Sequence, residues 1–105
     1  MNNNVLGFLG IIRRAGKLTI GFDPVVSSMA DGKSELVIMA GDISENTRKN
    51  IQKNAQKYCV HTVLSDCTKD DLSFAVGKLA AVVSIDDPNF AKSLKTKLTD
   101  EKEEC

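Results

Sequence analysis

A run of four consecutive apolar residues, Leu36 to Met39, limits the possible folds of this chain more than any other feature. Within residues 35–40 the apolar character is nearly continuous, which is typical of a strand covered on both faces. The run therefore predicts a central strand. A second, mostly apolar run over residues 80–85 predicts another strand of the same kind.

The remaining segments alternate between strand and helix patterns. Short apolar stretches predict two further strands over residues 17–20 and 61–64. Apolar residues at helical spacing predict five helices over residues 5–15, 23–31, 42–57, 68–75 and 87–98, the fourth beginning at either Ser65 or Thr68. This order predicts an α/β fold in which a largely parallel or mixed sheet lies between helical layers.

Three of the helix starts carry capping residues. Asp23 and Asp87 each precede a proline, so each is predicted to cap a helix whose first position is that proline. Asp42 and Glu45 have the spacing of a capping box, which predicts that Asp42 caps the third helix.

The charge of the chain is unevenly distributed. The 105 residues carry 14 basic and 14 acidic side chains, a length that suits one domain. Residues 99–105 alone carry a net charge of −3 and are predicted to form a frayed acidic tail, which leaves +3 on a single domain over residues 1–98. The first 22 residues contain Arg13, Arg14 and Lys17 and no carboxylate. This bias suits phosphate binding, and it equally suits an ordinary solvated surface.

The sequence lacks the motifs of catalytic and metal-binding proteins. It has no glycine-rich phosphate loop, no nucleophile elbow and no cluster of metal-ligand spacing, and its single histidine is His61. We therefore expect no enzymatic activity, no metal and no cofactor. The three cysteines lack CxxC spacing and predict a reducing, cytoplasmic location. The apolar run over residues 5–12 is too short to span a bilayer, so no membrane partner is expected.

An ordered set of segments resembles a known family. The segments are Gly21-Phe22-Asp23 at a helix start, residues 35–42 followed by Asn46-Thr47, residues 72–78, and residues 81–85. Together they resemble the L7Ae/L30e superfamily of ribosomal, kink-turn RNA-binding proteins over about residues 5–98. The arginine-rich first helix and the series Asp42, Asn46-Thr47 and Lys49 are most similar to its bacterial YlxQ-like branch of ribosomal-protein-like proteins.

The resemblance implies a three-layer α/β/α sandwich with a four-stranded mixed sheet. It also implies an RNA-binding surface made by the start of the second helix and the loop before the last strand. Family members carry Gly-Thr-Asn-Glu-x-x-Lys at that helix start, where Asn and Glu read sheared G·A pairs and Lys holds the backbone. Here Gly21 is kept and Phe22 follows it. Asp23 replaces the Asn, Pro24 the Glu and Ser27 the Lys.

The second part of that surface is an apolar loop that covers an extruded base in the family. Its counterpart here is the shorter segment of residues 77–80. Leu79 either packs on a base or fills the core beneath the sheet, and the sequence favours neither.

The combined prediction is a non-enzymatic RNA-binding factor of the translation apparatus that recognises structured, kink-turn-like RNA, with ribosomal proteins as candidate partners. Arg14, Lys17, Lys69 and Lys78 are predicted to neutralise phosphate. The alternative is a protein-interaction module that kept the fold and lost the RNA-reading residues. The replacements at residues 23, 24 and 27 favour that alternative.

Overall fold

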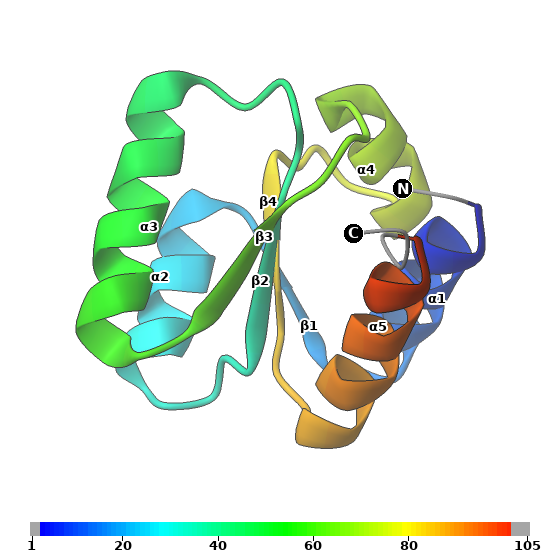
Figure 1. The fold of residues 1–105 in the computed structure, drawn as a ribbon, viewed down its shortest axis with the longest axis horizontal. Coiled ribbons are helices and arrows are strands. Elements are labelled where there is room, and N and C mark those ends of the chain that lie inside the picture. Colours follow the sequence, from blue (N-terminus) through cyan, green and yellow to red (C-terminus); the bar gives the residue numbers. More distant parts are fainter. Residues whose placement is uncertain (1–2, 102–105) are drawn as a thin grey trace.

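The computed structural model describes residues 3–101, with side chains described for residues 5–97. Helices and strands alternate along the chain (Figure 1). In order they are α1 (Asn3–Arg14), β1 (Leu18–Ile20), α2 (Phe22–Ala30), β2 (Leu36–Met39), α3 (Glu45–Tyr58), β3 (His61–Leu64), α4 (Lys69–Val76), β4 (Val82–Ile85) and α5 (Pro88–Glu101). The predicted alternation is confirmed.

The strands form one mixed sheet in the order β1-β4-β2-β3. β4 runs antiparallel to both of its neighbours, so Val83 lies opposite Ile20 of β1 and Ile38 of β2. β2 runs parallel to β3, with Leu36 opposite His61. β2 and β4 are buried along their whole length, whereas β3 at the edge has exposed ends. The two apolar runs therefore form the centre of the sheet, a position predicted for residues 35–40.

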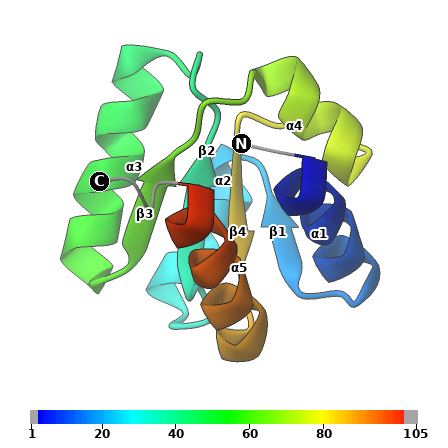
Figure 2. The same ribbon diagram turned by 45° about the vertical axis from the view of Figure 1, so that its right-hand side comes forward.

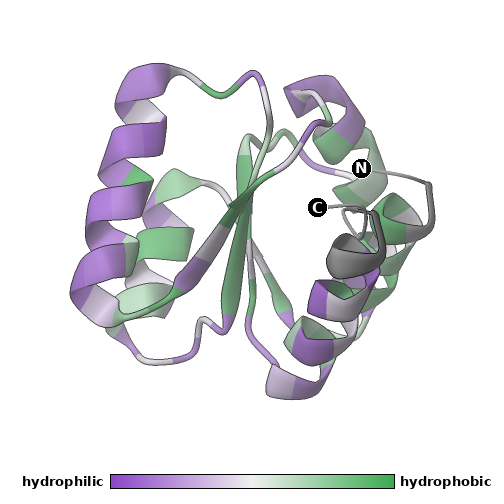
Figure 3. Ribbon diagram, in the orientation of Figure 1, coloured by the Kyte–Doolittle hydropathy of each residue, from purple (hydrophilic) through white to green (hydrophobic). Residues whose placement is uncertain are grey.

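Helices cover both faces of the sheet, and each face has its own core. α2 and α3 pack on one face, and α1, α4 and α5 pack on the other (Figure 1). Leu36 and Ile38 point into the core beneath α1, α4 and α5, whereas Val37 and Met39 point into the core beneath α2 and α3. The outer faces of the helices are largely hydrophilic (Figure 3). This arrangement confirms the three-layer α/β/α sandwich.

The last helix closes the core on the α1 side. α5 lies in front of β4 in Figure 2, and its Leu94 is fully buried. The rings of Phe8 in α1 and Phe90 in α5 meet edge to face with centroids 5.7 Å apart. α5 continues through Glu101, past Thr99 where the sequence predicts the acidic tail to begin. Residues 102–105 of that tail lie outside the described residues, and the domain boundary stays a prediction.

The predicted cap of α2 is wrong. The helix begins at Phe22, so its N-cap is Gly21, and Asp23 lies in the first turn without capping it. Gly21 has a φ of 102°, a conformation that a residue with a Cβ rarely adopts, and its carbonyl accepts the N–H of Val25 at 3.0 Å. The turn out of β1 requires this glycine, which places the N-cap two residues before the predicted one.

The predicted capping box of α3 is wrong as well. Ser44 caps the helix, because its Oγ accepts the N–H of Thr47 at 3.2 Å. The carboxylate of Asp42 instead accepts the backbone N–H of Lys69 at 2.8 Å and so joins the β2–α3 loop to the start of α4. A contact between residues so distant in sequence leaves no trace in local spacing.

The other capping predictions are confirmed. Of the two predicted starts of α4, Thr68 is correct: its Oγ1 accepts the N–H of Asp71 at 3.0 Å, and the Asp71 carboxylate accepts the N–H of Thr68 in return. Asp87 caps α5 by accepting the N–H groups of Asn89 at 2.8 Å and Phe90 at 3.2 Å.

Candidate nucleic-acid interface

The start of α2 and the loop before β4 meet at one end of the sheet. β1, β2 and β3 end there and β4 begins there, at the top of Figure 1. The N–H of Gly21 donates to the carbonyl of Val82 at 3.1 Å, and the N–H of Ala40 donates to that of Ala81 at 2.9 Å. We call this surface, made of residues 21–24 and 77–80, the strand-end face.

The first turn of α2 offers free backbone donors to this face. The N–H groups of Phe22 and Asp23 have no intrahelical partner because they lie in the first turn, and no side chain caps them. Asp23 and Pro24 are exposed, and the Phe22 side chain is 37% exposed. Backbone donors and the positive end of the helix dipole together favour an anion at this position. The Asp23 carboxylate partly supplies that negative charge itself.

The starts of α3 and α4 differ from that of α2. Ser44 occupies a first-turn donor of α3, and Thr68 and Asp71 form a reciprocal capping box on α4. Their caps therefore compete with any phosphate for the same N–H groups. Of these three helices, only α2 begins without a side-chain cap that competes with an anion for the first-turn N–H groups.

The α4–β4 loop presents an apolar side chain beside these donors. Leu79 is 86% exposed, so the alternative in which it fills the core is wrong, and the alternative in which it packs on a base stays a prediction. Ser73 anchors the loop, because its Oγ accepts the N–H of Ala80 at 2.9 Å and lies 3.2 Å from the carbonyl of Ala80. With Ala80 buried and held in this way, Leu79 projects from a fixed backbone.

One lysine belongs to the strand-end face, and a second lies beside it. Lys78 follows the left-handed Gly77 at the end of α4, and Lys69 is the first residue of that helix; both are exposed. The backbone behind Lys69 is closely packed, since the Gly41 N–H donates to the Cys67 carbonyl at 2.7 Å. A Cβ on Gly41 would lie 2.6 Å from the carbonyl oxygen of Ser65, which leaves no room for a larger residue. The loops that carry these cations are thus firmly positioned.

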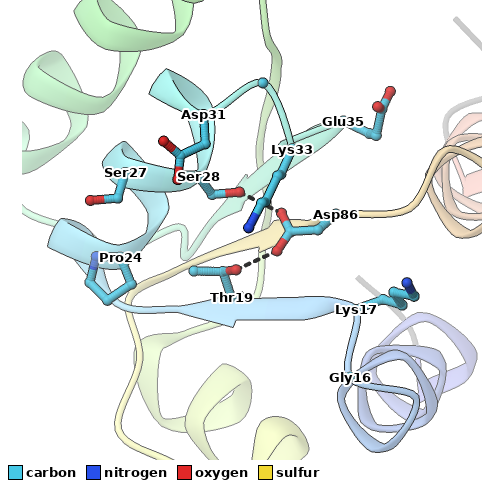
Figure 4. A pocket seen from close by; sticks show the side chains of 11 residues that line it. Gly16, Lys17, Thr19, Pro24, Ser27, Ser28, Asp31, Lys33, Glu35 and Asp86 are labelled. Carbon is cyan, nitrogen blue, oxygen red and sulfur yellow. Dashed lines mark hydrogen bonds between the residues drawn. The ribbon is translucent and has the colours of Figure 1, made fainter.

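A polar pocket of about 690 Å³ continues from this face along α2 and β1 (Figure 4). It runs from Pro24 in the first turn of α2, past Ser27, to Lys17 before β1. Its titratable lining residues are Lys17, Lys33, Asp31, Glu35 and Asp86. Three carboxylates against two lysines disfavour phosphate here. Ser27 and Lys17 therefore line the same pocket, but Lys17 does not lie at the strand-end face.

Asp86 fixes the position of α2 on the sheet, a role that the sequence analysis missed. Its carboxylate accepts hydrogen bonds from Thr19 Oγ1 in β1 and from Ser28 Oγ in α2 (Figure 4), and a third from Ser84 Oγ in β4. The latter two distances are both 2.8 Å. In the sequence Asp86 is one of two adjacent aspartates, of which Asp87 is the helix cap. The position of Asp86 two residues beyond Ser84, on the same side of the chain, is the signal that distinguishes it.

Arg14 lies away from the strand-end face as well. It lines a groove between α1 and α4 together with Phe74. The neighbouring Arg13 reaches the end of α4, where a Cβ on Gly77 would lie 2.8 Å from its Nη1. The predicted site residues consequently divide into three groups: the strand-end face with its lysines, the polar pocket and the α1–α4 groove.

Within the part of the chain that the structure describes, no three His, Cys, Asp or Glu side chains gather in a way that would hold a metal ion. No helix among residues 3–101 has both the length and the apolar character needed to cross a bilayer.

Residues 3–95 match the family model of the ribosomal protein L7Ae/L30e/S12e/Gadd45 family. The chain belongs to this family. Curated relatives include the RNA-binding protein YlxQ of Enterococcus faecium, which is 30% identical over 90 residues and covers 86% of each chain. The RNA-binding protein YlxQ of Bacillus subtilis is 31% identical over 87 residues, covering 82% of this chain and 86% of its own. The predicted likeness to the YlxQ branch of the L7Ae family is confirmed.

Two solved structures share this fold. A protein of unknown function from Bacillus halodurans C superposes with a TM-score of 0.84 at 26% identity, covering 90% of this chain and 96% of that one. The 15.5kD RNA binding protein of Giardia lamblia superposes with a TM-score of 0.75, covering 92% and 89%. At 19% identity the second likeness supports the fold alone.

Proposed function

We propose that this L7Ae-family protein binds structured RNA of the kink-turn type through the strand-end face and acts in the translation apparatus without catalysing a reaction. The uncapped start of α2 beside the exposed Leu79 carries the proposal. It combines backbone donors for phosphate with an apolar cover for an extruded base. The names of the two YlxQ relatives, both RNA-binding proteins, support an RNA partner.

Each residue of the face has a role in this proposal. The N–H groups of Phe22 and Asp23 receive a phosphate or a base edge, and Gly21 holds them in place. Leu79 packs on the extruded base. Lys69 and Lys78 contact the RNA backbone, as does the exposed Ser27 one turn along α2, where the polar pocket adjoins the face. The logarithm of affinity falls by about 0.9 per phosphate contacted for each decade of salt. Because the face has few cations, the total salt dependence should be shallow.

The replacement of the family's Asn, Glu and Lys weakens recognition of the sheared G·A pairs. Asp23 cannot donate as an amide does, Pro24 offers no carboxylate, and Ser27 has no positive charge. All three side chains are exposed, so the combined variant Asp23→Asn, Pro24→Glu and Ser27→Lys should fold normally. Restoring charged hydrogen bonds worth about 1.5–3 kcal/mol each should raise kink-turn affinity by roughly tenfold or more.

The test compares a kink-turn RNA with a straight duplex of matched length in a gel shift at moderate salt. The proposal predicts that the wild-type chain prefers the kink-turn, that Leu79→Ala weakens this preference, and that the triple variant strengthens it. Leu64→Ala serves as the control for the loss of an exposed leucine, since Leu64 is 41% exposed on the edge strand β3, which β2 separates from β4. Equal and weak binding of both RNAs would refute kink-turn recognition.

The replacements in the first turn of α2 also favour the second candidate, a protein-interaction module. Its test is a pull-down from lysate treated with ribonuclease. A complex that dissolves on treatment supports the RNA proposal, whereas one that persists and depends on residues 21–24 supports the protein module.

A further inference from the structure

A groove of about 470 Å³ between α1 and α4 has no role in the function proposed so far. Leu6, Gly7 and Gly10 of α1 line one wall, and Phe74 and Ala75 of α4 line the other. Gly10 is required for packing, because a Cβ there would lie 3.2 Å from the carbonyl oxygen of Ala75. Gly7 has no such constraint, since nothing lies within 4 Å of the position of its Cβ. The missing side chain of Gly7 therefore leaves the groove open without serving the contact between the helices.

Among the side chains that the structure describes, residues 5–97, Phe74 is the most exposed large hydrophobic one, at 91%. Its helix packs on the sheet through Leu72 and Val76, so the fold does not need this ring. Leu79, at 86% exposed, follows it five residues later in the α4–β4 loop. An accessible aromatic face is the group on which an unpaired base stacks, and such stacking tolerates any base.

Free positive charge accompanies this ring. Arg14 lines the groove with Phe74, and Arg13 lies against Gly77, which precedes Leu79 by two residues in the sequence. Neither arginine forms an ion pair with another of the described residues. The groove also includes Asp71, but its carboxylate accepts the N–H of Thr68 in the capping box. An exposed ring can stack on the base of a nucleotide, and a nearby guanidinium group without an ion-pair partner among the described residues can bind its phosphate.

We propose that unpaired nucleotides extending from the structured RNA pass from Leu79 into the α1–α4 groove, where a base stacks on Phe74 and its phosphate contacts Arg14. Arg13 contacts the connecting phosphate beside Gly77. This inference rests on the RNA-binding function proposed above, and it gives the groove a task separate from kink-turn recognition. It also accounts for the position of Arg14, which is remote from the strand-end face.

The test measures fluorescence anisotropy with two forms of one kink-turn RNA, one blunt and one with four unpaired uridines on both ends. The extended form should bind about tenfold more tightly, as expected for one stacked base. Phe74→Ala should abolish this gain and leave blunt-RNA affinity and the unfolding midpoint unchanged. Gly7→Leu, which fills the groove while keeping the ring, should abolish it too. The control Leu64→Ala should preserve the gain.

The outcomes separate the two proposals. If the blunt RNA binds and the extension adds nothing, or if the gain survives Phe74→Ala, the groove assignment is wrong and kink-turn binding stands. If neither form binds, the RNA function itself is wrong and the groove assignment falls with it. A protein partner that is lost with Phe74→Ala and resists ribonuclease would assign the groove to protein and overturn the inference.

Discussion

Replacing Asp86 by alanine should destabilise the protein more than any other single removal of a surface-accessible charge. This carboxylate joins three elements, because Thr19 of β1, Ser28 of α2 and Ser84 of β4 all donate to it. Ser28 is 6% exposed and Ser84 is fully buried, so their hydroxyl groups have little access to replacement water.

The size of the loss follows from these contacts. A hydrogen bond to a charged group contributes about 1.5–3 kcal/mol, and a buried hydroxyl left without a partner costs about 1–3 kcal/mol. Two circumstances reduce the loss. Ser84 retains Ser34, whose Oγ lies 2.6 Å away, and Thr19 borders the open polar pocket. We therefore expect Asp86→Ala to lower the free energy of unfolding by about 3 kcal/mol and the melting temperature by about 10 °C or more.

The assay is urea unfolding followed by circular dichroism, with Asp87→Ala as the matched control. Asp87 carries the same charge at the next position but serves as a helix cap, and its loss should cost about 1 kcal/mol. Asp86→Asn keeps an oxygen for Ser28 and Ser84 and should cost about 1 kcal/mol. If Asp86→Ala costs no more than Asp87→Ala, the idea that Asp86 positions α2 is refuted.

Further predictions concern single backbone positions. Gly7→Ala should stabilise the protein by about 1 kcal/mol, because alanine has the higher helix propensity. Gly10→Ala should gain nothing or destabilise the protein, because its Cβ would press on the carbonyl oxygen of Ala75. Thermal unfolding measures both, and the two variants carry the same substitution in the same helix. Cys59 ends α3 with a φ of 59°, so Cys59→Gly should stabilise by about 0.5–1 kcal/mol in urea, and an equal loss would contradict the strain argument. Ser44→Ala should cost about 1 kcal/mol by the loss of the α3 cap, measured in the same way.

The fold could be predicted from the sequence where its determinants are local. The apolar run of Leu36 to Met39 identifies a strand buried on both faces, and the periodicity of the helices places all five. Asp87 was predictable as a cap because the proline after it fits the first helical turn. The same reasoning failed at Asp23, since the turn at Gly21 begins the helix earlier than the Asp-Pro pair indicates.

The candidate site was predictable only in part, because its geometry depends on contacts between distant segments. The family resemblance pointed to the start of α2 and to Leu79, and hydrogen bonds of Gly21 and Ala40 with the start of β4 bring these together. Counting positive charges along the chain, by contrast, grouped Arg14 and Lys17 with that face. The short separation in sequence does not reveal that the extended strand β1 places the start of α2 roughly 13 Å from Lys17.

The most direct test of the strand-end face is an amide chemical-shift map of the uniformly labelled protein during titration with a blunt kink-turn RNA. Our account predicts the largest shifts at Gly21, Phe22, Lys78 and Leu79, with small shifts around the polar pocket. Largest shifts centred on the pocket near Lys17, or no shifts at saturating RNA, would contradict it.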